Sequence, residues 1–363
     1  MDERQHLSLL VVSPDHRGGP GRSRDGPRPV RDFGYARATD VAATVATLDH
    51  GNATVIAGGT ELLNWLRLGI SEDDNVLDIG AVDELHGITR RGDELFIGAL
   101  TTLNDLAAHP AVDNGAAALA SACRQAASAQ IRNRATLGGN VLQRTRCPYF
   151  RAEAPLPWAC NKRVPGSGCS ALTGHHERQA IFGWTEQCVA VQPSDPAVAL
   201  AALDAQVDVT GPAGTRSIAM TEFHLTQEEA AAQGDPLREH RLEPAELITG
   251  YRLTLCPEEG QAYVKVRERA SYEYAIVSAA ATVRSEAGVI RAARVALGSV
   301  AQKPWRLTDI EPQLVGLTLD RAVLMPVLTR AMAAAKPLPN NGFKIVLAAR
   351  AAVRALLIAG GTP

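Results

Sequence analysis

The chain has 363 residues, 46% of them apolar, which is enough for two or three domains with their own hydrophobic cores. It carries 37 Lys and Arg against 39 Asp and Glu, a formal net charge of -2, and no long basic run, which argues against nucleic acid or an anionic membrane as a partner. Its apolar runs are far shorter than the roughly 20 residues that cross a bilayer, so we expect no membrane span.

Residues 1–31 are expected to form a disordered tail. Between Ser13 and Arg31 the chain is rich in Gly, Pro and Arg, a composition that cannot build a core. We interpret this stretch as a tail or as an over-extended start of translation. The apolar run at 7–12 is too short for the core of a signal peptide, so the chain's own sequence predicts a cytoplasmic location.

Residues 32–225 are expected to form the first domain, which mixes strands and helices. A strand at 54–57 is followed by a Gly58-Gly59 turn and a helix at 60–68, and an Ala-rich helix is expected at 116–128. A second Gly-Gly turn follows at Gly138-Gly139, and a helix at 195–203 begins with Pro196 in its first turn. The polar stretch 226–245 is the expected linker.

Residues 246–363 are expected to form a second domain of strands followed by helices. Strands are predicted at 247–255, 262–266, 279–283 and 293–297, and helices at 321–334 and 342–357. The fold class predicted for the whole chain is α+β.

The two Gly-Gly pairs suggest a phosphate site. At the first pair, a strand turns into a helix, and such a turn leaves backbone N–H groups beside the positive end of the helix dipole. Two loops of this kind about 80 residues apart could hold the two phosphates of one dinucleotide. Neither loop matches the Rossmann or P-loop pattern. Each pair alone is also explained by an ordinary turn.

Four of the six cysteines fall in one 42-residue window, at Cys147, Cys160, Cys169 and Cys188. The window has no Cys-x-x-Cys knuckle, is rich in Pro and Gly, and carries several Arg and Lys that would offset a negatively charged cluster. An iron-sulfur cluster, a zinc site to which His175 or His176 contributes, and unrelated thiols or disulfides all remain open on spacing alone.

No hydrolase nucleophile, His-Glu-x-x-His motif or pair of catalytic carboxylates is present in the sequence. Glu61 is interpreted as a carboxylate that complements a helix dipole. The pattern therefore favours a protein that holds a cofactor.

Several motifs, taken in order, resemble those of one family. They are Ala57-Gly-Gly-Thr-Glu61, Ile97-Gly-Ala-Leu-Thr-Thr102, Ile131-Arg-Asn-x-Ala-Thr-Leu-Gly-Gly-Asn140, Pro193-Ser-Asp195 and Ala296-Leu-Gly298. This set resembles the FAD-binding middle subunits of molybdenum hydroxylases, from Phe33 to the C-terminus. Leu142-Gln-Arg-Thr-Arg-Cys-Pro-Tyr-Phe150, Cys160-Asn-Lys-Arg-x-Pro-Gly-Ser-Gly-Cys169 and Lys265-Val-Arg-x-Arg-Ala-Ser-Tyr272 are most similar to the flavin subunits of periplasmic aldehyde oxidoreductases.

The resemblance implies a two-part FAD-binding domain of the vanillyl-alcohol-oxidase type, not a Rossmann fold, followed by a C-terminal domain with an antiparallel sheet and helices. By match to the family motifs, Asp195 would contact FAD near the flavin, and Leu247, Ile248 and Lys265 would approach the isoalloxazine. The pyrophosphate and ribose would be held by Ile56, Ala57, Gly58, Gly59, Thr60, Glu61, Leu62, Leu63, Asn64, Thr136, Leu137, Gly138, Gly139 and Asn140.

In that subgroup an insertion, here residues 144–188, holds a [4Fe-4S] cluster, which implies Cys147, Cys160, Cys169 and Cys188 as ligands. The resemblance further implies a heterotrimer. A large subunit with molybdopterin cytosine dinucleotide would oxidise an aldehyde, a small subunit with two [2Fe-2S] clusters would relay electrons, and this chain would pass them through FAD to an external acceptor. The alternative to a cytoplasmic location is then periplasmic, by co-export with a signal-bearing partner.

Overall fold

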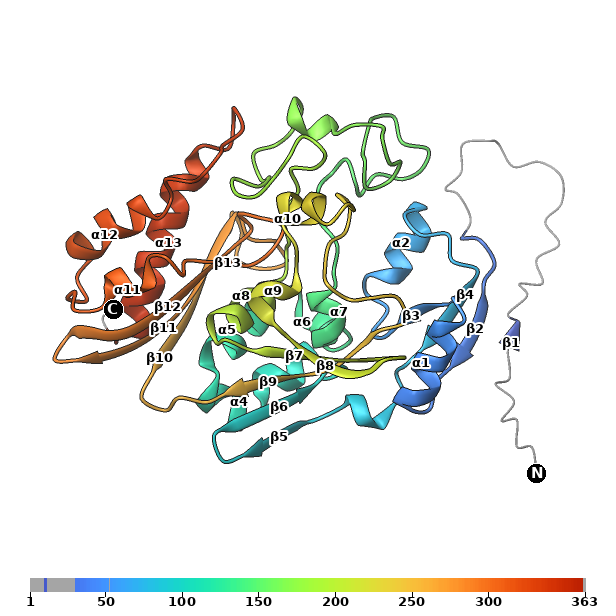
Figure 1. Ribbon diagram of the computed structural model, residues 1–363, viewed down its shortest axis with the longest axis horizontal. Helices are drawn as coiled ribbons and strands as arrows, with labels where there is room; N and C mark the ends of the chain where they lie inside the picture. The colour runs from blue at the N-terminus through green and yellow to red at the C-terminus, as the bar shows by residue number, and fades with distance from the viewer. Residues whose placement is uncertain (1–9, 12–29, 52, 362–363) are drawn as a thin grey trace.

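The computed structural model describes residues 10–11, 30–51 and 53–361 (Figure 1). The predicted disordered tail at 1–31 lies almost entirely outside these residues. In the described ranges, no helix has the length and apolar character that crossing a membrane requires.

The N-terminal part is a small, mostly parallel sheet with strand order β1-β2-β4-β3. Its strands are β1 (Leu10–Val11), β2 (Gly34–Arg37), β3 (Thr54–Ile56) and β4 (Asn75–Asp78). The crossover helices are α1 (Val41–Asp49), capped by the Asp40 side chain, and α2 (Leu62–Leu68). Because β2, β3 and β4 run parallel, their carboxyl ends meet at one edge, and the Gly58-Gly59 turn leaves β3 at that edge.

A five-stranded antiparallel sheet with order β5-β6-β9-β7-β8 completes the first domain. Its strands are β5 (Ile88–Arg91), β6 (Glu94–Gly98), β7 (Gln206–Gly211), β8 (Gly214–Ala219) and β9 (Leu247–Thr254). The largest apolar core lies between this sheet and the helices beside it. Those helices are α3 (Leu103–Ala108), α4 (Pro110–Gly115), α5 (Ala117–Gln125) and α8 (Asp195–Ala202).

The C-terminal part is an antiparallel sheet covered on one face by helices, with its own apolar core. The strands are β10 (Gly260–Val266), β11 (Val277–Glu286), β12 (Val289–Gly298) and β13 (Trp305–Arg306). The helices are α11 (Glu311–Leu314), α12 (Arg321–Arg330) and α13 (Phe343–Ala359). Helices α5 and α8 of the first domain also contact this sheet, so the two sheets are joined through a shared helical layer.

The remaining elements are short. They are η1 (Asp83–Leu85), α6 (Ala129–Arg132), α7 (Leu137–Val141), η2 (Ser170–Leu172), α9 (Met220–Phe223) and α10 (Gln227–Ala232). The segment 144–188, which we call the cysteine segment, contains η2 and otherwise consists of loops along one side of the molecule (Figure 1).

The α+β fold class is confirmed, with its antiparallel C-terminal sheet. Three local features differ from the sequence-based expectation. Gly138 and Gly139 lie in helix α7 rather than in a turn, because the Thr136 side chain caps that helix. The expected linker 226–245 contains α10, which a Thr226–Glu229 capping box stabilises. Strand β9, expected in the second domain, pairs with β6 and β7 in the first.

Candidate functional site

The first Gly-Gly loop connects β3 to α2. Gly59 has a φ of +75°, a left-handed conformation that favours glycine. Among the described residues, the backbone N–H groups of Gly59 and Thr60 have no hydrogen-bond partner, whereas both carbonyl groups accept bonds from α2. The loop therefore presents free donors beside the first turn of a helix, an arrangement that suits an anion.

Gly58 brings this loop against the second Gly-Gly segment. A Cβ at Gly58 would lie 1.8 Å from the backbone oxygen of Arg134, so no other residue fits without moving one of the two segments. Gly58 thus packs against the chain just before the second glycine pair, and both pairs line one cavity.

The second Gly-Gly segment differs from the first because its donors are already used. Gly138 donates to the Ala99 oxygen at 2.9 Å, and Gly139 donates to Oγ1 of Thr136 at 3.2 Å. Asn140 ends the segment, and its Oδ1 accepts a 2.7 Å hydrogen bond from Ser194. This segment therefore supplies a close-packed wall and an oriented amide rather than a second set of free N–H groups.

Two adjoining cavities meet at Thr60, Glu61 and Gly139. The smaller, about 190 Å³, is mostly apolar and is lined by Ile56, Ala57, Gly58, Gly59, Leu62, Thr136, Gly138, Leu247 and Ile248 among others. The larger, about 390 Å³, is more polar and is lined by Asn64, Asn140, Arg146, Asp195, Tyr272 and Tyr274 among others. Of the other predicted residues, Leu63 is exposed on α2 and Leu137 is fully buried behind the cavities.

Asp195 and Lys265 form a buried ion pair at the wall of the larger cavity. Lys265 Nζ lies 2.7 Å from one carboxylate oxygen, and the Tyr263 hydroxyl donates to the other at 2.5 Å. Burial raises the pKa of Asp195, and the bonds from Lys265 and Tyr263 oppose that change. The pair joins α8 to β10, so Lys265 holds Asp195 rather than lining the cavity itself.

The structure separates the three residues that were expected around the isoalloxazine. Leu247 and Ile248, on β9, line the smaller cavity together with both glycine pairs. Lys265, on β10, pairs with Asp195, which lines the larger cavity. The three residues therefore cannot all face the same part of a bound molecule.

Sequence reasoning did not identify Arg146 and Tyr274 as site residues. The Arg146 guanidinium lies 4.5 Å from the centre of the Tyr274 ring and pairs with Glu61. Burial lowers the pKa of Arg146 to about 10, and its Nε has no hydrogen-bond partner among the described residues. The signal available in the sequence was the position of Arg146 directly before Cys147.

The four cysteines of the cysteine segment are free thiols in one apolar cluster with Phe150, Val189 and Ala190. Cys160 and Cys169 lie on paired backbone segments, and burial raises the pKa of Cys147 to about 12 and of Cys188 to about 11. Within the described ranges, no group of three or more Cys, His, Asp or Glu is placed to hold a metal ion.

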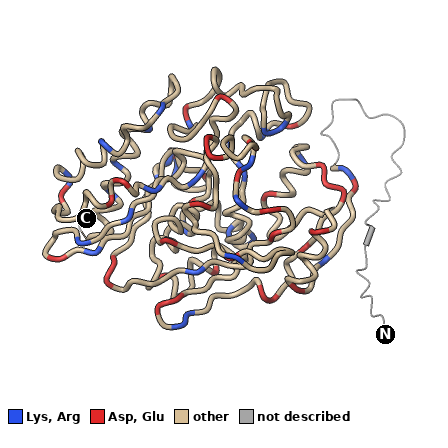
Figure 2. The backbone as a smooth tube through the Cα atoms, viewed as in Figure 1, with Lys and Arg blue, Asp and Glu red and all other residues tan. Residues whose placement is uncertain are grey.

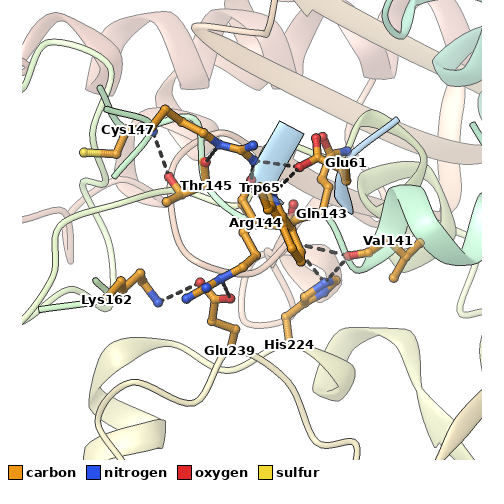
Figure 3. A network of polar contacts seen from close by, with 12 residues as sticks. Glu61, Trp65, Val141, Gln143, Arg144, Thr145, Cys147, Lys162, His224 and Glu239 are labelled. Carbon is orange, nitrogen blue, oxygen red and sulfur yellow. Dashed lines mark hydrogen bonds and ion pairs between the residues drawn. The ribbon is translucent and has the colours of Figure 1, made fainter. Parts of the chain in front are cut away.

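A partly buried charge network lies beside the cysteine segment (Figure 3). Arg144 and Lys162 both contact Glu239, at 2.7 and 2.8 Å. Burial alone would raise the pKa of Glu239, but the two cations outweigh it and lower the pKa to about 2. The network ties the cysteine segment to the chain that follows α10.

Comparison with known proteins identifies the family. Residues 31–253 match the family model described as the FAD binding domain in molybdopterin dehydrogenase, and residues 262–358 match that of the CO dehydrogenase flavoprotein C-terminal domain. The chain is 41% identical over 327 residues to the aldehyde oxidoreductase FAD-binding subunit PaoB of Escherichia coli, covering 88% of this chain and 96% of that protein. The chain belongs to the FAD-binding subunits of the molybdenum hydroxylases. The family resemblance seen in the motifs is thereby confirmed.

This flavoprotein subunit is also similar to subunits of other molybdenum hydroxylases. It is 24% identical to the carbon monoxide dehydrogenase medium chain of Hydrogenophaga pseudoflava, over 89% of this chain and 96% of that one. Its fold matches a carbon monoxide dehydrogenase structure from the same organism, with a TM-score of 0.71 at 23% identity, covering 92% of this chain and 99% of that chain. Quinoline 2-oxidoreductase from Pseudomonas putida 86 gives a TM-score of 0.70 at 21% identity, covering 92% and 99%.

The cavities of the flavoprotein subunit fit FAD in their chemistry. The free N–H groups of Gly59 and Thr60 suit a pyrophosphate, and they lie where the two cavities meet. One of the two adjoining cavities is mostly apolar and the other more polar. The subunit is therefore an FAD-binding part of an oxidoreductase.

Proposed function

We propose that this chain is the FAD and iron-sulfur subunit of a heterotrimeric, molybdenum-containing aldehyde oxidoreductase. The observation that carries the proposal is the 41% identity to an aldehyde oxidoreductase subunit, against 24% for a relative named for carbon monoxide. The proposed partners are a large subunit with molybdopterin cytosine dinucleotide and a small subunit with two [2Fe-2S] clusters. When bound, FAD would receive the electrons of aldehyde oxidation and pass them to an external acceptor.

FAD is proposed to lie across the two adjoining cavities. Thr60 and Gly59 would bind the pyrophosphate at the junction, and Leu247 and Ile248 would contact the adenosine half in the apolar cavity. Asp195, held by Lys265, would face the isoalloxazine in the polar cavity. Support comes from the residues that line each cavity and from the free N–H groups between them.

Cys147, Cys160, Cys169 and Cys188 are proposed to ligate one [4Fe-4S] cluster. Their gathering in one apolar cluster and the nearby cations Lys162 and Arg144 support this assignment. A four-iron core is much larger than a single ion, so its ligands need not converge on one point. Because burial raises the pKa of Cys147 and of Cys188, binding of these two thiols as thiolates would release protons.

Reconstitution with the two partner subunits tests the electron path. We expect aldehyde to bleach the flavin absorption of this chain within the complex, and to leave the flavin of the isolated chain oxidised. Aldehyde turnover by the isolated chain would instead indicate a self-contained FAD oxidase. An isolated chain that contains zinc and no iron would indicate a zinc-stapled assembly module.

A further inference from the structure

Helix α2 has contacts with the cysteine segment at both of its ends. At the N-terminal end, Glu61 precedes the helix and pairs with Arg146 and with Arg151, the latter at 2.8 Å. Glu61 also accepts a 2.8 Å hydrogen bond from the indole of Trp65, one turn further along. The same carboxylate therefore contacts helix α2 through Trp65 and the chain on both sides of Cys147 through the two arginines.

At the C-terminal end of α2 the contact is made by Arg163. Its guanidinium donates to the Gly69 oxygen at 2.8 Å and to the Leu68 oxygen at 3.4 Å. It also donates to the oxygens of Phe150 and Ala152, both at 2.8 Å. One side chain thus ties the end of the helix to two separate turns of the cysteine segment.

Two further contacts reinforce this end. The backbone N–H of Ala154 donates to the Leu68 oxygen at 3.1 Å. Ile70, directly after the helix, packs against the apolar cluster that contains the four cysteines. The residues that follow α2 are therefore part of the surroundings of the thiols.

The cysteine segment has little regular structure of its own to fix its position. Its 45 residues contain only the three-residue helix η2 and isolated backbone bridges as regular structure in the part of the chain that the structure describes. A segment of this kind takes its order from the surfaces that it docks on. Helix α2 is one such surface, and its first turn also forms the junction of the FAD cavities.

We propose that helix α2 couples FAD binding to the ordering of the cysteine segment, with Arg151 and Arg163 as the positioning residues at its two ends. This inference rests on the proposed function, since iron is the ligand expected to order the segment. A ligand that orders one of the segments packed on α2 lowers the free-energy cost of ordering the other segment. The coupling is reciprocal, so FAD must favour iron loading by the same factor by which iron favours FAD.

The test is the FAD dissociation constant of the full chain, measured by flavin fluorescence with and without iron loading. In the wild-type chain we expect FAD to bind about tenfold more tightly when iron is loaded. In Arg163→Met and Arg151→Met this ratio should fall towards one, because each variant loosens one end of α2. Arg163 is not a wall residue of either FAD cavity and its printed partners Leu68, Gly69, Phe150 and Ala152 are not either, so the iron-free affinity should change little in Arg163→Met. Arg151 contacts Glu61 at the junction of the cavities, so Arg151→Met is judged by the ratio alone.

Arg124→Met is the matched control. Arg124 also donates to a backbone carbonyl, that of Ala107, but it lies on α5 away from the cysteine segment. The ratio of the FAD dissociation constants without and with iron should therefore be the same in Arg124→Met as in the wild type. A wild-type ratio of one, or an unchanged ratio in both arginine variants, would overturn the coupling.

A wild-type chain that binds no iron would refute the proposed cluster without deciding the coupling, so a second readout is included. Limited proteolysis within 152–167, with and without FAD, reports the order of the segment directly. FAD should slow cleavage in the wild type and not in Arg163→Met. Equal protection by FAD in both chains would refute the coupling even if iron is absent.

Discussion

Gly58 lines the smaller cavity of the proposed FAD site and packs closely against the backbone of Arg134. Replacing Gly58 by Ala places a methyl group 1.8 Å from the Arg134 oxygen, so the loops must separate. We expect Gly58→Ala to lower the free energy of unfolding by about 3 kcal/mol and to lower bound FAD, measured by denaturant unfolding and by extraction of the flavin.

The control for this glycine is Gly342→Ala. Gly342 has a helical φ of -58°, and the nearest atom to an added Cβ is 4.0 Å away. The free energy of unfolding of Gly342→Ala should stay the same or rise slightly, because alanine restricts the conformations of the unfolded chain. Normal FAD content in Gly58→Ala would show that the two walls do not need this close approach.

Glu239 gives a prediction about pH. Its folded-state pKa of about 2 lies below the value of about 4.3 in an unfolded chain, so its ionised form stabilises the fold above that value. The stabilisation is lost as the pH falls from about 5 to about 2. At pH 7, Glu239→Gln should cost about 3 kcal/mol because Lys162, whose side chain is 4% exposed, loses its counter-charge.

Urea unfolding at several pH values measures this effect. The difference in unfolding free energy between wild type and Glu239→Gln should shrink steadily below pH 5. Glu258→Gln, which alters an 80% exposed carboxylate, should show no such trend. A difference that stays constant from pH 7 to pH 3 would contradict the assigned pKa.

The role of Glu61 could not be predicted from the sequence. Its position before a helix suggested interaction with the helix dipole, whereas in the fold it pairs with Arg146 and Arg151, 85 and 90 residues further along the chain. Local spacing carries no information on such a contact. The glycines and Asp195 were predictable as candidates because family motifs contain them, although their distribution over two cavities was not.

At the scale of elements, the strongly periodic ones were predicted well. Helix α13 and strands β10 to β12 lie within a few residues of their expected ranges because their apolar patterns are long. The sequence predicts a turn where helix α7 forms, since a Gly-Gly pair is a poor helix former. In the structure the Thr136 side chain caps this helix and Gly138 donates to the Ala99 oxygen. The pairing of β9 with β6 is a long-range contact that periodicity does not encode.

The cysteine segment yields a prediction at this scale. Replacing any one of Cys147, Cys160, Cys169 or Cys188 by Ser should lower bound iron and increase proteolysis between residues 144 and 187. Cys256→Ser should leave both unchanged, because Cys256 lies outside the segment. Cys123 is fully buried in the main core, so a serine there also tests packing and makes a poorer control.

Iron and sulfide analysis of the purified variants decides this prediction. Full iron in the Cys169 variant, or an equal loss in the Cys256 variant, would show that other groups hold the metal. Flavin loss in the ligand variants should be partial, as the coupling through α2 requires.

For the molecule as a whole, the proposed FAD site lies where parts of both domains meet. The parallel sheet supplies the first loop, the five-stranded sheet supplies β9, and Lys265 comes from the C-terminal sheet. Charges of both signs are scattered over the backbone (Figure 2), in keeping with the net charge of -2. In the proposed site, binding of FAD would therefore depend on how the domains pack rather than on any one motif.

Because the site is assembled from separate elements, the sequence predicts its motifs but not the contacts between them. Motif order sufficed to predict the family and the cofactor, because the motifs come from separate elements that the fold brings together. The contacts between the elements, such as Lys265 with Asp195, needed the structure.

FAD is proposed to occupy the two cavities that meet at Thr60 and Gly139. An experimental structure of the chain with FAD bound tests it most directly. We predict pyrophosphate oxygens within hydrogen-bonding distance of the Gly59 and Thr60 N–H groups, adenine beside Ile248, and the isoalloxazine beside Asp195. FAD bound outside both cavities, or in the reverse orientation, would contradict this placement of the cofactor.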